Sequence, residues 1–193
     1  MEHEELRRLI EAMSIANDTQ LTQKEGRWGI SGEPTEGALQ ALAGKLGFDP
    51  TAARRTSTLP FSSENKLMAT VADMDGSARI LVKGAPDRLL DRSATQLRGT
   101  EEEPLDRAYW EEQIELLSAQ GLRVLAAAER PAHQGDAGLL SLDALEELTF
   151  LGVVGIVDPP REAAIAAIET CHDSRHQRED DHRRPCGHCA CHR

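Results

Sequence analysis

The strongest constraint on the fold is a nearly continuous apolar run at residues 148–157 of this 193-residue chain. An apolar run without alternation is typical of a strand that other layers cover on both faces. Asp158, Pro159, Pro160 and Arg161 follow directly and end the run, because proline interrupts a central strand. The chain is therefore expected to fold as an α/β protein, with helices packed against a sheet.

The remaining segments predict the other helices and strands. Apolar residues at helical spacing indicate helices, and short β-forming runs separated by turn residues indicate strands. The expected helices cover residues 4–16, 34–47, 86–92, 105–120 and 162–171. The expected strands cover residues 58–61, 66–73, 78–82 and 122–128, with loops at 18–31 and 131–138. This order predicts a mainly antiparallel sheet flanked by helices over residues 1–150, and a separate unit from residue 151.

Composition narrows the class of protein. Hydrophobic residues make up 39% of the chain and charged residues 28%, which fits a soluble globular protein. No apolar run is long enough to cross a membrane, and the acidic N-terminus lacks the apolar region of a signal peptide. A formal net charge of −11 argues against nucleic acid as a partner, because phosphate backbones bind basic surfaces.

The sequence Lys83-Gly84-Ala85-Pro86-Asp87 is a candidate anion site. It follows an expected strand and opens an expected helix. Glycine lets a ligand approach the backbone, a helix start favours negative charge, and lysine supplies a cation. On these residues alone, an ordinary turn between a strand and a helix is the simpler interpretation.

Three further side chains are candidates for a ligand site. Phe61 precedes a strand and could stack on a purine ring, although a core position is the simpler interpretation. Glu36 could accept a hydrogen bond from an adenine amino group, or it could simply favour the helix dipole in a first turn. Arg123 lies in an otherwise apolar run and needs a partner there, which is either a phosphate or a neighbouring carboxylate.

Five segments, taken together and in this order, resemble the nucleotide-binding domain of P-type cation ATPases, especially the calcium-pump-like group. They are Gly32-Glu33-Pro34-Thr35-Glu36, Phe61-Ser62-Ser63-Glu64-Asn65-Lys66-Leu67-Met68, Lys83-Gly84-Ala85-Pro86-Asp87, Gly121-Leu122-Arg123-Val124-Leu125 and Asp158-Pro159-Pro160-Arg161. The resemblance covers about residues 1–173. Its most specific motifs are Lys-Gly-Ala-Pro and Asp-Pro-Pro-Arg, and Asp87 stands where the family usually has Glu.

The resemblance implies how the base and ribose of a bound ATP or ADP would be held. Phe61 would stack on adenine, Glu36 would contact the adenine amino group, and Leu125 would pack near the ring. Asp158 would approach the ribose, and together with Arg161 it would lie at the hinge that leads into the phosphorylation domain. Residues 151–173 would then be this hinge and the start of an incomplete phosphorylation domain.

The resemblance also implies how the phosphates would be held. Lys66 and Lys83 would line the adenine and phosphate pocket, and Gly84 would leave room for the ligand. Arg123 would reach the phosphates. Mg²⁺ would accompany the nucleotide, but the family's protein ligands for it lie in motifs that this chain does not contain. No metal-binding residue is therefore assigned.

The chemistry that the resemblance implies needs groups outside this sequence. The family transfers the γ-phosphate of ATP to an aspartate in the motif Asp-Lys-Thr-Gly-Thr, and this motif is absent here. The Mg²⁺-binding motifs Thr-Gly-Asp and Gly-Asp-Gly-x-Asn-Asp are also absent, as are membrane helices. We therefore expect a cytoplasmic, monomeric fragment that binds nucleotide without turning it over, and whose partner is the remainder of the pump.

The four cysteines all lie near the C-terminal end, at positions 171, 186, 189 and 191. The body contains none, so no disulfide framework holds it, and a reducing, cytosolic compartment is expected. The C-x-x-C spacing at residues 186–189, with histidines nearby, could bind zinc. A zinc-binding protein is therefore one hypothesis for this end of the chain.

A change of reading frame offers a different interpretation of residues 174–193. With GC-rich codons, a shift of one base can spell Gly-Ile-Ser-Val-Lys-Met-Ile-Thr-Gly-Asp, which resembles the continuation of the pump family. These residues also include no aromatic and no large aliphatic side chain. We therefore favour a frameshifted, disordered tail over a selected zinc site.

Two functions follow from the whole sequence. The first is the ATP-binding part of a P-type cation pump, whose intact form couples ATP hydrolysis through an aspartyl-phosphate to ion transport. The alternative is a non-catalytic regulatory or interaction protein that retained the fold and lost ligand binding. The joint presence of Glu36, Phe61, Lys66, Lys83 and Arg123 favours the first function.

Overall fold

The chain divides into two compact units, Met1–Val157 and Asp158–Arg193. The computed structural model describes residues 4–157 except 75, 134, 137 and 139, together with residues 166–168 and 170. In the second unit, the described residues are helical. Asp158, Arg161 and the tail at 174–193 lie outside the described residues, so their expected roles stay predictions. Within the described part, no helix combines the length and hydropathy that a membrane crossing requires.

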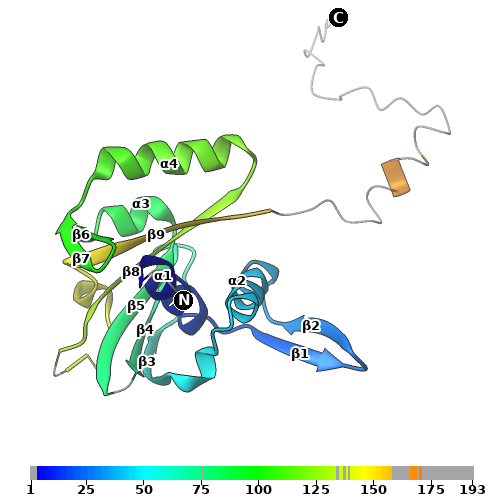
Figure 1. Cartoon of the computed structure of the whole chain (residues 1–193), viewed down its shortest axis with the longest axis horizontal. Helices are drawn as coiled ribbons and strands as arrows, with labels where there is room; N and C mark the ends of the chain where they lie inside the picture. The colour runs from blue at the N-terminus through cyan, green and yellow to red at the C-terminus, as the bar shows by residue number, and fades with distance from the viewer. Residues whose placement is uncertain are drawn as a thin grey trace, which may run out of the picture. The chain divides into compact units, whose positions relative to one another are not determined.

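A seven-stranded sheet forms the body of the first unit, with the strand order β3-β4-β5-β8-β9-β6-β7 (Figure 1). Neighbouring strands pair antiparallel except β6 and β9, which are parallel. The strands are β3 (Arg54–Leu59), β4 (Leu67–Met74), β5 (Ser77–Gly84), β6 (Ser93–Arg98), β7 (Glu101–Pro104), β8 (Arg123–Pro131) and β9 (Leu148–Ile156). The predicted α/β fold, with a mainly antiparallel sheet flanked by helices, is confirmed.

Helices cover both faces of this sheet. The helices are α1 (Glu4–Ile15), α2 (Pro34–Lys45), α3 (Pro86–Leu90) and α4 (Arg107–Ala119). Alternation along β5 shows the two layers, because Leu81 packs with residues of α1 and α2 whereas Ile80 and Val82 pack with α3 and α4. Both faces of the central strands are therefore buried, and a side chain's position in the strand decides which layer it joins.

The predicted loop at residues 18–31 was wrong, because this segment forms a hairpin. Strands β1 (Gln20–Lys24) and β2 (Arg27–Ser31) pair antiparallel in a separate two-stranded sheet. Figure 1 shows this hairpin projecting from the body beside α2. Glu25 and Gly26 both have positive φ angles, of 50° and 78°, as a tight hairpin turn requires. Every residue of β2 is exposed, and the alternation of Trp28 and Ile30 is too short a signal to have indicated a strand.

Several other elements were not predicted from the sequence. Strands β6 and β7 form a polar hairpin, and two short 3-10 helices, η1 (Pro50–Ala52) and η2 (Leu142–Ala144), lie in connections. The strand β8 extends to Pro131, beyond the predicted end at residue 128. These segments carry few apolar residues, so their conformation depends on partners that are distant in sequence.

The apolar run that first indicated a sheet forms β9, an interior strand next to the central strand β8. It pairs with β8 on one edge and with β6 on the other, and its first five residues are buried. A boundary was predicted at residue 150, whereas the compact unit continues to Val157. The physical reason is that β8 pairs with β9 as far as Ile156, so residues 151–156 are hydrogen-bonded within this sheet.

Candidate functional site

The side chains of Glu36 and Lys83 meet between α2 and β5. The Lys83 Nζ atom donates a hydrogen bond to the Glu36 Oε1 atom at 2.7 Å. Lys83 is only 5% exposed. Burial lowers the pKa of Lys83, and the hydrogen bond and charge of Glu36 oppose that shift. The structure therefore holds a desolvated ammonium group against a single described carboxylate.

The strand pattern explains why Lys83 points to this layer. It lies two residues after Leu81 in β5, and side chains two residues apart share a face of the sheet. In the sheet, Lys83 lies opposite Met68 of β4 and Ala127 of β8. Glu36 reaches the same place from the first turn of α2, which Pro34 opens with a φ angle suited to a helix start.

A tight turn brings Phe61 and Lys66 to the start of β4. The Lys66 backbone N–H donates to the Ser62 carbonyl oxygen at 2.8 Å, and the Asn65 backbone N–H donates to Ser62 Oγ at 3.1 Å. Phe61 is 60% exposed, so the predicted core position is excluded for this ring. An exposed aromatic ring beside a sheet end provides a surface on which a flat ligand can stack.

Gly84 joins this turn to the end of β5. The Ala85 N–H donates to the Lys66 carbonyl oxygen at 2.9 Å. A Cβ atom at residue 84 would lie 2.5 Å from that oxygen and 2.7 Å from Leu67 Cα, so only glycine fits without displacing backbone. Lys66 itself has a φ angle of 55°, in the left-handed region. The two loops that carry the predicted lysines are therefore held together by a close backbone contact.

Arg123 and Leu125 approach the same layer from β8. An Arg123 guanidinium N–H donates to Thr35 Oγ1 at 3.0 Å, one residue before Glu36. Leu125 is partly buried and packs with the α1 and α2 layer. Arg123 was expected to have a phosphate or a carboxylate as its partner. It lies exposed at the start of β8, and its described hydrogen-bond partner is the Thr35 hydroxyl.

The structure thus brings together residues from five places in the sequence. Among the predicted site residues, Glu36 contacts Lys83 directly, Gly84 contacts the Lys66 turn, and Arg123 contacts the turn of α2 that bears Glu36. Sequence reasoning missed Thr19, whose hydroxyl donates to Glu36 Oε2 at 3.2 Å. The run Asn17-Asp18-Thr19 carries the side chains of a side-chain-capped turn, and that signal could have indicated it.

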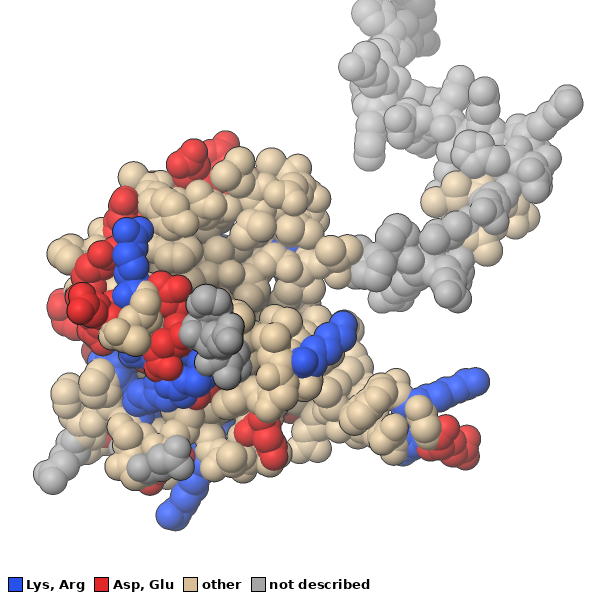
Figure 2. Space-filling model, in the orientation of Figure 1, with Lys and Arg blue, Asp and Glu red and all other residues tan. Residues whose placement is uncertain are grey.

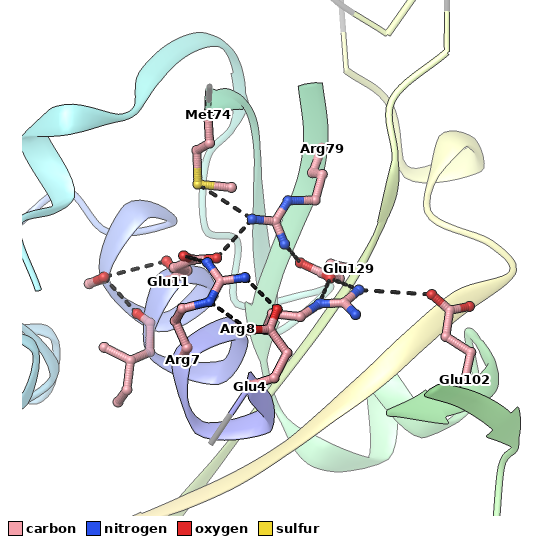
Figure 3. A network of polar contacts seen from close by, with 10 residues as sticks. Glu4, Arg7, Arg8, Glu11, Met74, Arg79, Glu102 and Glu129 are labelled. Carbon is pink, nitrogen blue, oxygen red and sulfur yellow. Dashed lines mark hydrogen bonds and ion pairs between the residues drawn. The ribbon is translucent and has the colours of Figure 1, made fainter. Parts of the chain in front are cut away.

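A second charged cluster lies in the same layer (Figure 3). Glu129 of β8 is fully buried and forms ion pairs with Arg8 of α1 and Arg79 of β5. Arg79 also donates to Glu11 at 2.8 Å, and Arg8 lies 3.8 Å from Glu102. We call these five residues the α1 charge network. It connects α1 to three strands of the sheet, and nothing in the sequence analysis indicated it.

The surface charge is uneven. Figure 2 shows acidic side chains gathered over the end of the molecule that carries β6 and β7 in Figure 1, with basic side chains directly beside them. Glu103 of β7 pairs with Arg98 at 3.2 Å, and Glu102 lies near Arg8. Arginines of neighbouring elements therefore compensate part of the acidic charge at this end.

A cavity of about 630 Å³ lies beside the β1–β2 hairpin. Residues of α1, α2, η1, β3 and the hairpin line it, among them Asn17, Thr19, Trp28, Gln40 and Arg55. None of the predicted site residues is part of that lining. The candidate site is therefore a set of converging side chains at a sheet end, and this cavity is a neighbouring feature. Within the described residues, no cluster of three or more metal-binding side chains occurs.

The fold and the site together define a class: an α/β domain that presents lysine, arginine, carboxylate and aromatic side chains at one end of its sheet. The family model described as the cytoplasmic domain N of P-type ATPases matches residues 5–163. The chain belongs to this family of P-type cation-transporting ATPases.

Relatives in several organisms support this assignment. The chain is 39% identical over 165 residues to the cation-transporting ATPase pma1 of Synechocystis, covering 83% of this chain and 18% of that protein. It is 38% identical over 172 residues to the sodium/potassium exporting P-type ATPase cta3 of Schizosaccharomyces pombe, covering 85% and 16%. It is 32% identical over 185 residues to the calcium-transporting ATPase of Bacillus subtilis, covering 90% and 20%. The chain therefore spans a fifth or less of these relatives' lengths.

Proposed function

We propose that this chain binds ATP and ADP, as the cytoplasmic nucleotide-binding part of a cation-transporting P-type ATPase. The observation that carries the proposal is the pairing of Glu36 with the buried Lys83 at 2.7 Å. The exposed ring of Phe61 belongs to the turn before β4, at the same end of the sheet. A buried ammonium with one described carboxylate partner is a strong attractor for a further anion. A nucleotide offers that anion together with a flat base.

The base would be held by three side chains. Phe61 offers an exposed aromatic face for stacking, which contributes about 1–3 kcal/mol per base in nucleic-acid binding proteins. Glu36 offers a carboxylate that can accept from the adenine amino group. Leu125 would pack near the ring from β8, where it is partly buried.

The phosphates would be held by cations from β5, β8 and the turn before β4. Lys83 and Lys66 would line the pocket, and Gly84 lets the segments that carry them approach closely, because a Cβ atom there would touch the neighbouring backbone. Arg123 is exposed and bound only to the neutral Thr35 hydroxyl among its described contacts, so its charge can turn to a phosphate. Arginine suits this role because its planar fork matches phosphate oxygens.

We extend the proposal to the intact protein through the relatives. Their names describe cation-transporting, sodium/potassium exporting and calcium-transporting ATPases. In the intact pump, ATP hydrolysis through an aspartyl-phosphate would drive ion transport, and Mg²⁺ would accompany the nucleotide. Asp158 and Arg161 would form the hinge to the phosphorylation domain. This chain alone would act in the cytoplasm as a monomer, binding nucleotide without hydrolysing it.

The test is a titration of the 193-residue chain with ATP, in which NMR spectra monitor the backbone amide signals of Phe61, Lys66 and Lys83. We expect saturable shifts clustered at these residues. Lys83→Ala should weaken binding by about tenfold or more, because it removes a charged hydrogen-bond donor. Lys45→Ala removes an exposed lysine at the end of α2 and serves as the matched control, with binding expected within about twofold of wild type.

The opposite result would favour a different function. If millimolar ATP moves no signals, the chain has kept the fold without nucleotide binding, and the regulatory or interaction protein becomes the better hypothesis. The observation that would support it is the exposed face of the β1–β2 hairpin, where Trp28 is 70% and Ile30 43% exposed. Exposed aromatic side chains of this kind are enriched where proteins bind one another.

A further inference from the structure

The residues between α1 and the hairpin form a turn that is tied to α2. The Asn17 Oδ1 atom accepts from the Thr19 N–H at 2.9 Å, which closes the turn. The Asn17 side-chain amide donates to the backbone carbonyl oxygen of Glu36 at 3.0 Å. Asn17 is 5% exposed and Thr19 is 3% exposed, so both side chains are buried against their partners. We call residues 17–19 the Thr19 turn.

The Thr19 turn holds the Glu36 side chain as well as its backbone. The Thr19 hydroxyl donates to Glu36 Oε2 at 3.2 Å, and the Asp18 N–H lies 3.4 Å from the same oxygen. The Thr19 hydroxyl also accepts from the Glu33 N–H at 3.0 Å. Glu33 is the N-cap of α2 and makes no side-chain cap of its own. Thr19 therefore caps α2 from a neighbouring segment and orients the carboxylate one turn further on.

Gly32 makes this close contact possible. A Cβ atom at residue 32 would lie 2.2 Å from Thr19 Oγ1, and the φ angle of 133° is one that side-chain-bearing residues rarely adopt. The hydroxyl can therefore reach the start of α2 only because residue 32 has no side chain. The contact between the Thr19 hydroxyl and the start of α2 therefore depends on the backbone conformation at residue 32.

Arg55 of β3 fixes the Thr19 turn to the sheet. One guanidinium nitrogen donates to the Asn17 carbonyl oxygen at 2.9 Å, and another pairs with Asp18 Oδ1 at 2.8 Å. A fork of two directed bonds restrains a turn more firmly than a single ammonium would. The position of Glu36 thus depends on a strand that contributes no predicted nucleotide contact.

The Glu36 carboxylate has an acceptor site that a ligand can use. An ionised carboxylate offers about four lone-pair sites. Among the described residues, Thr19 and Asp18 occupy those of Oε2, and Lys83 occupies one on Oε1. One acceptor site on Oε1 is left. Adenine presents an amino donor at its position 6, whereas guanine presents a carbonyl acceptor there. A carboxylate fixed in this way accepts from adenine and repels guanine.

We propose that the Thr19 turn, fixed by Arg55, is the positioning device that aims Glu36 at the base and so sets the preference of this site for adenine over guanine nucleotides. This inference rests on the proposed nucleotide binding. Thr19 and Arg55 are positioning residues, because they act on the ligand through Glu36.

The test compares ATP and GTP binding to the 193-residue chain and its variants by calorimetry. Thr19→Val removes the hydroxyl and keeps the shape, so ATP affinity should fall about tenfold while GTP affinity hardly changes. Thr19→Ser keeps the hydroxyl, so the ratio of its ATP affinity to its GTP affinity should stay within about twofold of the wild-type ratio. Thr51→Val makes the same chemical change at an exposed threonine whose hydroxyl donates to Asp49, and should leave the ratio unchanged.

Arg55→Met provides a second route, because it frees the Thr19 turn without altering the α2 cap. The ATP/GTP ratio should fall here too, by about two- to threefold. If Thr19→Val and Arg55→Met both bind ATP with the wild-type ratio, the positioning role is wrong. A uniform loss for ATP and GTP would also overturn it, because that result indicates only a structural defect.

A nucleotide-independent measurement separates this inference from the proposed function. The ammonium of Lys83 can be titrated by NMR without any nucleotide. Thr19→Val should lower the Lys83 pKa in the same direction as Glu36→Gln, because the carboxylate no longer stays against the ammonium. If wild type does not bind ATP, the proposed function fails, and an unchanged Lys83 titration in Thr19→Val would then overturn the positioning role as well.

Discussion

Strand β5 carries two cations on the same face, four residues apart, and the protein treats them in opposite ways. Arg79 lies between two carboxylates, donating to Glu11 and Glu129 at 2.8 Å each. Lys83 has one described carboxylate partner, Glu36, which accepts from it at 2.7 Å. A guanidinium fork suits a closed network, whereas an ammonium is a point charge that can change partners. The same face of one strand thus carries one cation held between two carboxylates and one cation that pairs with a single described carboxylate.

This difference predicts that substitutions around Arg79 and at Lys83 affect different properties, the first the free energy of unfolding and the second nucleotide affinity. Changes at the α1 charge network should lower the free energy of unfolding and leave nucleotide affinity alone. Changes at Lys83 should reduce affinity and affect stability less. The following predictions test that separation, beginning with the largest expected effect.

Breaking the α1 charge network should have the largest effect on stability. Glu129→Leu should lower the free energy of unfolding by about 3–5 kcal/mol, because the largely buried Arg8 and Arg79 lose their shared carboxylate. Urea denaturation measures the change. Glu102→Leu is the control, since that side chain is 48% exposed and lies 3.8 Å from Arg8, and its effect should be below about 1 kcal/mol.

The folded fraction of Glu129→Leu should still bind ATP with wild-type affinity. If its ATP affinity fell as much as that of Lys83→Ala, the α1 charge network and the proposed nucleotide site would be coupled. The expected separation of stability from binding would then be wrong. Equal stability of Glu129→Leu and wild type would show that the network does not hold α1 on the sheet.

The close backbone contact at Gly84 should give the next largest effect. Gly84→Ala should cost about 1–3 kcal/mol of stability, because its Cβ atom would lie 2.5 Å from the Lys66 carbonyl oxygen. Gly44→Ala is a control in which the free energy of unfolding should change in the opposite direction. It adds a methyl group in α2 where nothing lies within 4 Å, and should stabilise by about 0.5–1 kcal/mol. Thermal unfolding of both variants would show whether the two signs differ as expected.

The contribution of Lys83 to stability should depend on pH. The folded pKa of Lys83 lies below the ordinary value of 10.5, mainly because of burial. Between these two values the native state binds fewer protons than the unfolded state, so the contribution of Lys83 to stability rises with pH across this window. The difference in unfolding free energy between wild type and Lys83→Met should therefore grow in favour of wild type from neutral pH toward pH 10.5. A flat difference would contradict this.

The same ionisation should act on binding in the opposite direction. A bound phosphate favours the charged ammonium, so ATP affinity should fall as pH rises through the folded pKa of Lys83. In Lys83→Met this fall should disappear. Calorimetric titrations with ATP at a series of pH values would measure both proteins side by side.

The smallest effect is expected for an exposed ion pair. Arg107→Gln removes contacts with Asp91 and Glu111 at 2.8 and 2.7 Å, but all three side chains are about half exposed. Solvent screens such pairs, and the change in unfolding free energy should stay within about 0.5 kcal/mol. A loss comparable to that of Glu129→Leu would mean that burial does not explain the strength of the α1 charge network.

The sequence predicted those elements whose signal is local. Apolar periodicity located the four helices and the buried strands, because burial on a regular element repeats every two or every 3.6 residues. The hairpin β1–β2 was missed because its strands are short and β2 is fully exposed. The sheet continues past residue 150 because β8, which is distant in sequence, pairs with β9 as far as Ile156. Local patterns carry no information about such partners.

The candidate site shows the same limit. The residues near positions 36, 61, 83 and 123 were selected through their resemblance to a family, since each has an ordinary structural interpretation by itself. Thr19 and Arg55 act through contacts that span 17 and 38 residues, and the Arg8–Glu129 pair spans 121. A single sequence gives no pairing signal over such separations, so the network and the turn became visible only in three dimensions.

Strand β9 has a consequence for how the chain is made. It is the only link between β8 and the β6–β7 hairpin in the sheet, yet it is the last strand of the unit to be synthesised. Until residues 148–156 leave the ribosome, no strand is available to join β3-β4-β5-β8 to the β6-β7 hairpin, and the edge of β8 that pairs with β9 is unpaired. Unpaired edges of this kind are prone to aggregation and attract chaperones. Cooperative folding of this unit therefore waits for its final strand, which makes translation of that strand the step that commits the nascent chain.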